Sequence, residues 1–531
     1  MEGPATGRTT QDREAPGAGG VSPLRGDVGL LLVLLLAAAG IRTWLITHTE
    51  VAARDSIGYI RYAWQLRERP WQEVLQTSEA HPGYPLAILA VSPAVRAVVR
   101  GPESIVMQRS AQLANALAGT LLVLPMFFLG RELFGRAVGF WAALLFQCLP
   151  ASGRVLSDGL SEGLFLLWAA AALWTAVRAL RTGSPFDFVQ AGLFAGLSYL
   201  TRPEGALIAA VAGAVLLGSQ LVAAWRRPWR RVLGCAAGLG LTAAAVASPF
   251  VLATGSLTTK PTAHRILESA RLKGNREGGG APLVWGVWWP SRDNDSPADL
   301  HWALAALGLE LIKACHYAAW LPGLLALWWF RHRFRETPAV WVPALVGLLV
   351  MVVLGRMAVL VGYLSDRHTL LVILCGSYWM AAGALHLGAR LAARLAFLPL
   401  RPFGAGLILL GMIAAALPKT LEPLHANRSG FRQVGFWLAE HTAPSDVVID
   451  PYFWSHYYAG RVFTEGKQPS DPPGHPPLRY VVLERGGSEH VRLRLLPEAE
   501  RLKERGQLVY HWTGRRPRHR AEVFVYAVPP E

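Results

Sequence analysis

Cysteine is scarce in this chain of 531 residues, and its placement excludes two kinds of scaffold. The four residues, Cys148, Cys235, Cys315 and Cys375, all lie inside apolar runs. Their spacing fits neither a zinc site nor a disulfide framework, and the chain contains no HExxH motif. We therefore interpret them as small buried hydrophobic side chains.

Acidic residues are also few, 36 against 52 lysines and arginines, which gives a formal net charge of +16. Such an excess can indicate a nucleic-acid partner, but no basic face lies on a soluble module here. Much of the arginine instead falls in short clusters between apolar runs, at residues 131–136, 178–181, 226–231, 331–335 and 390–401. Such clusters are typical of cytoplasmic loops beside anionic headgroups, so we predict membrane lipids as partners and no nucleic acid.

Apolar sequence is abundant, since 52% of the residues are hydrophobic. It comes in runs of about 16–25 residues, long enough to cross a hydrocarbon layer of roughly 30 Å. The runs centre near residues 38, 118, 143, 170, 194, 214, 242, 317, 347, 377 and 412. Only helices can supply so many crossings, because each segment must satisfy its own backbone hydrogen bonds. The sequence therefore predicts a polytopic α-helical membrane protein with about eleven spans.

The arginine clusters, placed in the cytoplasm, orient the whole chain. Residues 1–27, rich in Gly, Pro and charge, are predicted to form a disordered cytoplasmic tail, and residues 28–424 the transmembrane part. The external loops are then 48–104, 151–159, 254–300 and 356–367. The Ala-, Arg- and Leu-rich composition is typical of bacteria, so we predict the bacterial inner (plasma) membrane.

Residues 425–531 have a different sequence pattern, without long apolar runs. The patterns DVVID, RYVVLER and EVFVYAV alternate with helical stretches such as FRQVGFWLAEH and LPEAERLKERG. Short strands between helices indicate a small soluble α/β domain. The number of spans before it places this domain outside the cell.

The charged segment after the first apolar run contains the first candidate site residue, Asp55. Ile57, Ile60 and Trp64 fall on one face of an amphipathic helix that would lie flat on the bilayer. Tyr59 lies one helical turn from Asp55. Two interpretations stay open for this carboxylate: a catalytic group that faces the outside, or a simple helix cap.

A second acidic site is the pair Asp158 and Glu162 in LSDGLSEG, one turn apart at the start of the fourth span. Acids at this point also suit the positive end of a helix dipole, so a purely helix-terminal role stays open. A carboxylate that enters the membrane is nevertheless costly unless it is functional or paired. If a divalent cation is used, these two acids are the predicted ligands.

Cationic residues form the third candidate site. They are His81 before the Pro82-Gly83 turn, Arg367 in the Asp366-Arg367-His368 segment, and Lys260, His264 and Arg265 in the second large external loop. Arginine fits phosphate oxygens with two hydrogen bonds. The alternative for Arg367 is that its side chain only reaches toward lipid headgroups.

These features together resemble a known family. Asp55 in the first external loop, an HPGYP turn, RELFGR after the second span and an acidic pair in the next external loop occur in that order. The chain is thereby similar, over about residues 28–420, to the GT-C superfamily of glycosyltransferases. It most resembles the dolichyl-phosphate-mannose protein mannosyltransferases and their bacterial relatives, including the lipid A aminoarabinose transferases. The segments GLSYLTRPEGALI and RHTLL also resemble that family.

The resemblance implies an enzyme that takes a sugar from a polyprenyl-phosphate carrier and passes it to a protein, lipid or glycan hydroxyl on the outer face. Asp55 matches the family's first-loop catalytic acid, and Asp158 its second-loop acid. His81 falls where the aminoarabinose transferases carry a phosphate-binding lysine. This chain departs from the family at Gly83, where a second proline is usual.

The predicted mechanism is a single inverting displacement. Asp55 acts as general base, and His81, Arg367, Lys260, His264 and Arg265 neutralise the leaving phosphate. Tyr59, Asp158 and Glu162 orient the acceptor, the sugar or a metal ion. Two alternatives remain: a lipid-linked sugar transporter or flippase without chemistry, and a membrane scaffold that presents the C-terminal domain. The sequence indicates no certain cofactor, and it leaves the sugar and the acceptor open.

Overall fold

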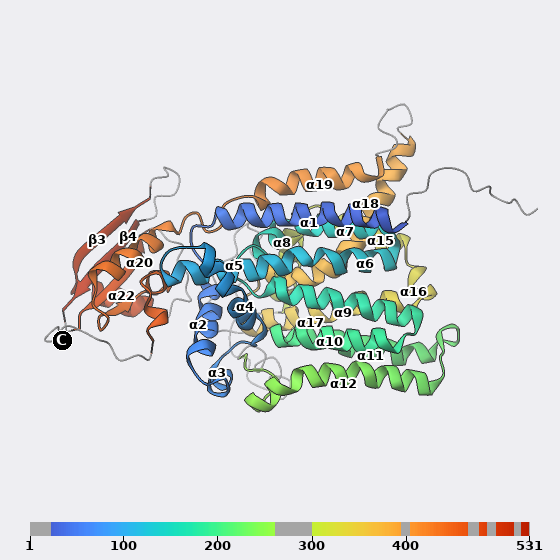
Figure 1. The fold of residues 1–531 in the computed structure, drawn as a ribbon. Coiled ribbons are helices and arrows are strands. Elements are labelled where there is room, and N and C mark those ends of the chain that lie inside the picture. Colours follow the sequence, from blue (N-terminus) through green and yellow to red (C-terminus); the bar gives the residue numbers. More distant parts are fainter. Residues whose placement is uncertain are drawn as a thin grey trace, which may run out of the picture.

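The computed structural model describes residues 23–260, 300–394, 404–465, 477–485, 495–514 and 522–529. Within these ranges the chain forms a bundle of long, roughly parallel helices with a small sheet domain at one end (Figure 1). His264 and Arg265, predicted above to bind phosphate, lie outside the described residues.

The helices of the bundle follow one another through short connections. They are α1 (Pro23–Thr47), α2 (Arg54–Glu68), α3 (Trp71–Thr77), α4 (Gly83–Val98), α5 (Glu103–Leu121), α6 (Val123–Phe134), α7 (Arg136–Cys148), α8 (Pro150–Val155), α9 (Glu162–Thr182), α10 (Pro185–Thr201), α11 (Ala206–Gly218), α12 (Trp229–Thr254), α14 (Leu300–Ala314), α15 (Trp320–Trp329), α16 (Arg333–Glu336), α17 (Trp341–Val361), α18 (Leu370–Arg394) and α19 (Gly404–Thr420). Two short 3₁₀ turns matter for the site, η1 (Pro203–Gly205) and η5 (Asp366–Thr369).

Seven helical stretches of the described chain are long and apolar enough to cross a membrane. They are Gly26–Thr47, Glu103–Phe134, Glu162–Thr182, Pro203–Leu221, Trp229–Thr254, Pro338–Val361 and Asp366–Arg394. Shorter apolar helices add Gly83–Val98, Arg136–Cys148, Trp320–Trp329 and Gly404–Thr420. The prediction of a polytopic helical membrane protein is confirmed. Seven helical stretches of the described chain, rather than the eleven predicted, are long enough to cross a membrane.

The apolar run near residue 317 is not one continuous helix. It breaks between α14 and α15, where His316 and Tyr317 have positive φ angles of 48° and 62°. The break is attached to α19, because Nε2 of His316 lies 3.1 Å from the Ala415 carbonyl oxygen.

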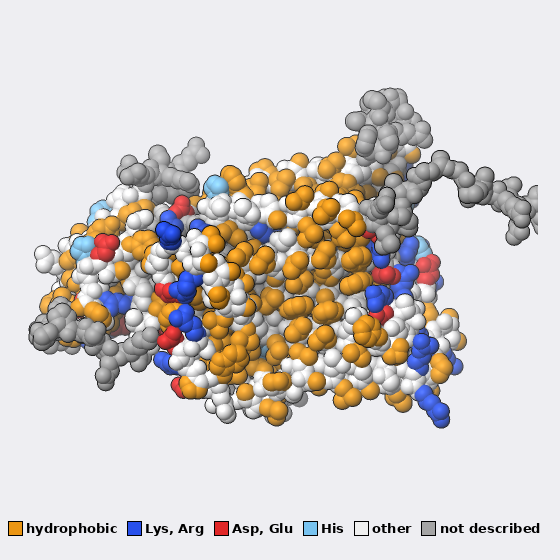
Figure 2. All heavy atoms as spheres, viewed as in Figure 1, with side chains coloured by type: hydrophobic (Ala, Val, Ile, Leu, Met, Phe, Trp, Pro, Cys, Tyr) orange, Lys and Arg blue, Asp and Glu red, His pale blue; other side chains and the backbone are white. Residues whose placement is uncertain are grey.

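The face of the bundle drawn in Figure 2 carries an apolar belt. Figure 2 shows hydrophobic side chains over the middle of the helices and charged side chains in bands toward both ends. Large apolar side chains of the bundle are exposed, for example Leu36 of α1 at 72% and Leu241 of α12 at 70%. Large apolar side chains in such a belt suit contact with lipid tails rather than with water.

Several arginine clusters gather at the end of the bundle opposite the sheet domain. Arg131 and Arg136 both pair with Asp27, at 2.8 Å and 2.7 Å. Arg181 pairs with Glu132 at 2.7 Å, so the ends of α6 and α9 meet there. The clusters at 131–136 and 178–181 therefore share one end of the molecule, as the loop assignment requires.

The C-terminal domain is a four-stranded mixed sheet flanked by helices. The strands are β1 (Val447–Ile449), β2 (Arg479–Arg485), β3 (Gln507–Thr513) and β4 (Glu522–Val528), in the order β1-β2-β4-β3. β1 pairs parallel with β2, and the other pairs are antiparallel. The helices are α20 (Ser429–His441), α21 (Trp454–Tyr458) and α22 (Leu496–Lys503). Alternating burial along β4, with Val523 and Val525 buried, explains why this segment forms a strand. The C-terminal part of the chain thus contains strands and helices, as predicted, and they form a small mixed sheet with flanking helices.

Candidate active site

Asp55 lies in the first turn of α2, at the end of the bundle that carries the sheet domain. The N-cap residue of this helix is Ala53, and no side chain makes a capping hydrogen bond. The capping interpretation of Asp55 is therefore wrong. Its Oδ2 instead accepts a hydrogen bond from Nη2 of Arg367 in η5. The Asp55 side chain is 50% exposed, so a substrate can reach it from the water side.

A second ion pair is almost fully buried. Arg202, directly after α10, donates to Oε1 of Glu162 at 2.7 Å and to Oε1 of Glu204 in η1 at 3.3 Å. The side chains of Arg202 and Glu162 are only 12% and 5% exposed. Charges buried to this degree are tolerated only when they are paired, and one arginine here compensates two carboxylates.

Several polar atoms of this network are buried without a hydrogen-bond partner in the described chain. They are Nε of Arg202, Nε of Arg367, Oε2 of Glu162 and Oε2 of Glu204. Buried polar atoms in native proteins are nearly always satisfied. Four such atoms in one network leave it with unused hydrogen-bonding capacity in the described chain.

His81 is buried beside the network and is not the cation that the sequence suggested. Its Nδ1 lies 2.7 Å from the Tyr199 carbonyl oxygen, which can only accept, so Nδ1 carries the proton. Nε2 lies 3.1 Å from Oγ1 of Thr258 and then accepts from that hydroxyl. Burial first, and then the positive charge of Lys260, lower the pKa of His81 to about 4. His81 is thus a neutral imidazole that joins the end of α10 to the segment that follows α12.

Lys260 supplies the positive charge at this position instead. Burial first, and then Arg202, lower its pKa to about 8. The residue still interacts with the carboxylates of Glu204 and Glu162, and with the guanidinium of Arg367. Lys260 therefore remains a cation at neutral pH and lies close to both ion pairs.

Asp158 and Glu162 do not share a site in the way the sequence suggested. Asp158 precedes α9, and its Oδ2 lies 2.6 Å from Nε2 of His425 at the start of the C-terminal domain. Its Oδ1 accepts from the backbone N–H of Gly159 at 2.8 Å and of Ala53 at 3.4 Å. Glu162 faces Arg202 instead. In the described ranges no group of three or more His, Cys, Asp or Glu could hold a metal ion.

Tyr59 connects α2 with the start of α9. Its hydroxyl lies 3.1 Å from Oγ of Ser161, and its ring packs edge-on against Tyr84 with the centroids 5.1 Å apart. Burial, and then the charge of Glu162, raise the pKa of Tyr59. The phenol stays protonated and can act as a hydrogen-bond donor beside the carboxylates of Glu162 and Asp55.

The structure thus brings together three acids and three cations from segments far apart in sequence. The acids are Asp55, Glu162 and Glu204, and the cations are Arg202, Arg367 and Lys260. Sequence reasoning missed Arg202 and Glu204. Their signal was present in the TRPEG turn, two opposite charges between two apolar runs. His368, next to Arg367, is a third residue that it did not single out as a member of the site.

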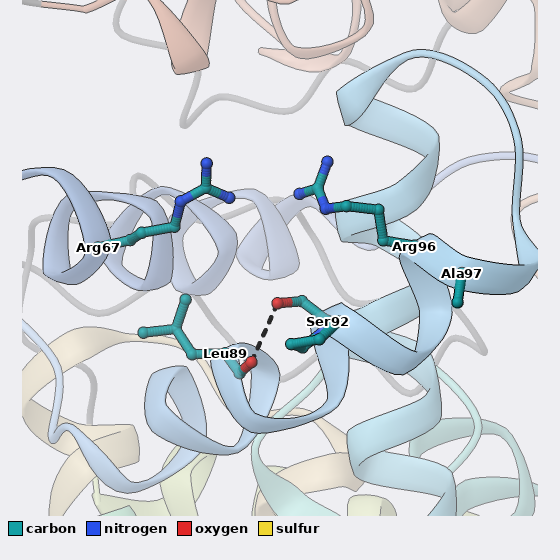
Figure 3. A pocket seen from close by; sticks show the side chains of 6 residues that line it. Arg67, Leu89, Ser92, Arg96 and Ala97 are labelled. Carbon is teal, nitrogen blue, oxygen red and sulfur yellow. Dashed lines mark hydrogen bonds between the residues drawn. The ribbon is translucent and has the colours of Figure 1, made fainter.

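A separate groove opens between α2 and α4 (Figure 3). Its volume is about 560 Å³, and it is lined by Arg67, Leu89, Ser92, Pro93, Arg96 and Ala97. The guanidinium of Arg96 is paired with Glu103, at 2.5 Å. The lining includes no member of the charged cluster around Asp55, so the groove is distinct from the candidate active site.

Comparison with known families confirms the resemblance predicted from the sequence. Residues 71–252 match the model of the family described as dolichyl-phosphate-mannose-protein mannosyltransferase. This family consists of glycosyltransferases, the class of enzyme that the sequence predicted. No match was found among curated proteins.

Two solved structures have a fold similar to that of this chain. The first is ArnT from Cupriavidus metallidurans bound to undecaprenyl phosphate: TM-score 0.55, 14% identity, with 94% of this chain and 97% of ArnT covered. The second is the archaeal oligosaccharyltransferase AglB from Archaeoglobus fulgidus in complex with an inhibitory peptide and a dolichol-phosphate. For AglB the TM-score is 0.56 and the identity 14%, with 86% of this chain and 62% of AglB covered. The chain therefore spans less than two thirds of the length of AglB, and it shares its fold with both.

Proposed function

We propose that this chain is an integral-membrane glycosyltransferase, because part of it matches the mannosyltransferase family model and its fold is similar to that of ArnT. It transfers a sugar from a polyprenyl-phosphate carrier to a hydroxyl group of a protein, lipid or glycan. The observation that carries the proposal is the pairing of a half-exposed carboxylate, Asp55, with Arg367 next to the buried cations Arg202 and Lys260. The bound undecaprenyl phosphate of ArnT and the dolichol-phosphate of AglB support the choice of donor.

Asp55 acts as the general base. Its Oδ2 is held by Arg367, and no described residue donates a hydrogen bond to Oδ1. Oδ1 can therefore accept the proton of an acceptor hydroxyl. Proton removal by a positioned carboxylate is typically worth about 10²–10⁴-fold in rate. The Arg367 contact holds the Asp55 carboxylate in one orientation, as a positioned base requires.

The displacement needs one bond to form and one to break. The acceptor oxygen attacks the anomeric carbon as its proton passes to Asp55, and the bond from that carbon to the phosphate oxygen breaks. The configuration at the anomeric carbon inverts. Polyprenyl phosphate leaves with one additional negative charge, which Arg367, Arg202 and Lys260 stabilise as it develops. Glu162 and Glu204 keep these cations in place, and Tyr59 donates to the sugar or the acceptor.

Asp158 has a different part in this proposal from the one that the family comparison first implied. It holds the backbone at Ala53, two residues before Asp55, while its second oxygen binds His425. Asp158 is thus a positioning residue for the base. The pair predicted to bind a divalent cation does not form one ligand set, so no step is assigned to a metal.

The orientation in the membrane is part of the proposal. The Asp55 cluster and the C-terminal domain lie at one end of the bundle, and the arginine clusters at 131–136 and 178–181 lie at the other. The positive-inside rule then places the active site and the C-terminal domain outside. In a bacterial inner membrane this is the extracytoplasmic face.

The test uses purified full-length protein in proteoliposomes with a radiolabelled polyprenyl-phosphate sugar and a mixture of candidate acceptors. A glycosyltransferase releases polyprenyl phosphate and forms a labelled product. A flippase leaves the donor intact and moves it between the leaflets. Movement without any cleavage of the donor, across a panel of sugars and acceptors, would overturn the proposal in favour of the transporter.

A further inference from the structure

The C-terminal domain is attached to the short segment that leads into the helix of Asp55. Residues 48–53 connect α1 to α2, and in this segment Val51, Ala52 and Ala53 are buried. The strand-like bridge between Thr49 and Leu424, with a hydrogen bond from the Glu50 N–H to the Leu424 carbonyl oxygen at 3.1 Å, begins the attachment. A surface loop has no need of such burial, so the segment is fixed in place.

Two side chains of α21 satisfy both backbone polar groups of Ala52. The indole N–H of Trp454 donates to the Ala52 carbonyl oxygen at 2.8 Å. The hydroxyl of Tyr458 accepts from the Ala52 N–H at 2.8 Å and donates to Oε1 of Gln108 in α5 at 2.8 Å. Trp454 and Tyr458 are 8% and 1% exposed, so these bonds are shielded from water. Ala52 is thus held between the C-terminal domain and the membrane bundle.

Other contacts hold the residues on either side of Ala52. Arg432 of α20 donates to the carbonyl oxygen and to the carboxylate of Glu50. On the other side, the Ala53 N–H is held by Asp158, which binds His425. Ala53 is the N-cap of α2, and Asp55 follows two residues later. The position of the α2 start therefore depends on contacts from the C-terminal domain.

We propose that Trp454 and Tyr458 are positioning residues for the proposed base, so that the C-terminal domain is a structural part of the active site rather than an independent binding module. The inference rests on the proposed function of Asp55. A general base must be placed within hydrogen-bond reach of the proton it removes, and a displacement of about 1 Å can lower a rate by about 10²-fold. When Tyr458 loses its hydroxyl, the Ala52 N–H and Gln108 Oε1 both lose a partner, and α2 shifts or loosens at its start.

The neighbouring Tyr457 provides a matched control. Both tyrosines are buried, and both donate one hydrogen bond to α5, because the Tyr457 hydroxyl binds the Ser104 carbonyl oxygen at 2.5 Å. Only Tyr458 also holds Ala52. The variants Y458F and Y457F remove the same atom from adjacent positions, so their difference reports the contact with the α2 segment.

The experiment compares both variants with wild type in two measurements on full-length protein in detergent or proteoliposomes. Hydrogen exchange of the peptide that covers residues 49–58 needs no substrate, and we expect it to accelerate in Y458F and to stay unchanged in Y457F. In transfer kinetics, kcat of Y458F should fall about 10- to 100-fold with donor KM changed less than about threefold, as expected for a displaced base. W454F should show the same pattern as Y458F.

If wild type is active, equal hydrogen-exchange rates and equal kcat values in Y458F and Y457F would overturn the inference. An inactive wild type would instead count against the proposed function, and the exchange measurement would still decide whether α21 holds the start of α2. Loss of activity in both variants in proportion to a lowered melting temperature would show a general role in folding, and it too would contradict a specific positioning role.

Discussion

Arg367 donates a hydrogen bond to the carboxylate of Asp55 although the two residues are 312 positions apart in the chain. The contact joins the start of α2 to η5, at the beginning of α18. It gives Asp55 a fixed direction and leaves one of its oxygens without a donor in the described chain. An acid held in this way is suited to remove a proton at one defined position.

Replacement of Arg367 should affect activity far more than stability. The pair is partly exposed, and exposed pairs contribute about 0–1 kcal/mol to the free energy of unfolding. We expect R367Q to lower kcat at least about 10²-fold, because both the orientation of the base and the stabilisation of the leaving phosphate are lost. R367K should retain more activity, since it keeps the charge but not the planar fork. Transfer kinetics and thermal unfolding in detergent measure the two effects.

The control for Arg367 is R96Q. Arg96 also forms an arginine–carboxylate pair near the same end of the molecule, with Glu103, but it does not belong to the cluster around Asp55. R96Q should leave kcat within about twofold of wild type, as expected of a surface pair. An R367Q variant as active as R96Q would remove Arg367 from the mechanism.

Replacement of one member of the buried pair of Glu162 and Arg202 should lower the stability of the protein strongly. R202Q removes the arginine that pairs with both Glu162 and Glu204, and removal of one partner of a buried pair typically costs about 3–5 kcal/mol. We expect the double variant E162Q/R202Q to recover a large part of that loss, because Glu162 then no longer carries an uncompensated charge. A denaturant titration in mixed micelles gives the coupling energy. Strictly additive effects of the two substitutions would show that the pair does not interact.

Donor binding should weaken as the pH rises through about 8. Lys260 has its pKa lowered to about 8 by burial and by Arg202. It is therefore charged below that pH and becomes neutral above it, well before an ordinary lysine. We expect kcat/KM for the donor to decline above pH 8 in wild type, and the decline to move to higher pH in K260R, because arginine stays charged.

The lysine control for this pH profile is K313R. Lys313 pairs with Glu310 in α14 at 2.7 Å and belongs to neither ion pair of the cluster, so its replacement should leave the profile unchanged. An alkaline decline that is identical in wild type and K260R would assign the titration to another group.

The proposed orientation can be tested by labelling of introduced cysteines. All four native cysteines are buried, so they should react slowly with a membrane-impermeant maleimide. Glu73 in α3 and Arg335 in α16 are exposed and belong to the proposed outer and inner ends. We expect E73C to be labelled in intact cells and R335C only after permeabilisation. The reverse pattern would place the Asp55 cluster in the cytosol and contradict the account.

The sequence predicted the elements of the fold better than the partners of the site residues. The patterns RYVVLER and EVFVYAV became β2 and β4, because their alternation matches the two faces of a sheet. β3 was not predicted: its pattern QLVYHWT remains largely exposed and carries little periodic signal. The break at His316 and Tyr317 was also missed, because an apolar run does not show where its backbone turns.

The site shows the same limit more sharply. Asp55 could be singled out because a charged segment follows an apolar run, and that signal is local. Its pairing with Arg367 depends on helix packing and has no local signal. His81 was interpreted as a cation because a sequence does not reveal burial, and burial is what makes it neutral. Arg202 and Glu204 lay inside a turn that looked like an ordinary connection between two spans.

The central claim is that Asp55 removes the acceptor proton, and the most direct measurement is transfer by purified D55N beside the matched control E73Q. Asparagine keeps the size of the side chain and its hydrogen-bonding oxygen but is not basic. We expect D55N to retain the wild-type melting temperature within a few degrees and to lose at least about 10²-fold in kcat, the typical worth of a general base. E73Q, which changes an exposed acid of α3, should transfer at the wild-type rate. A D55N protein that turns over at the rate of E73Q would contradict the account.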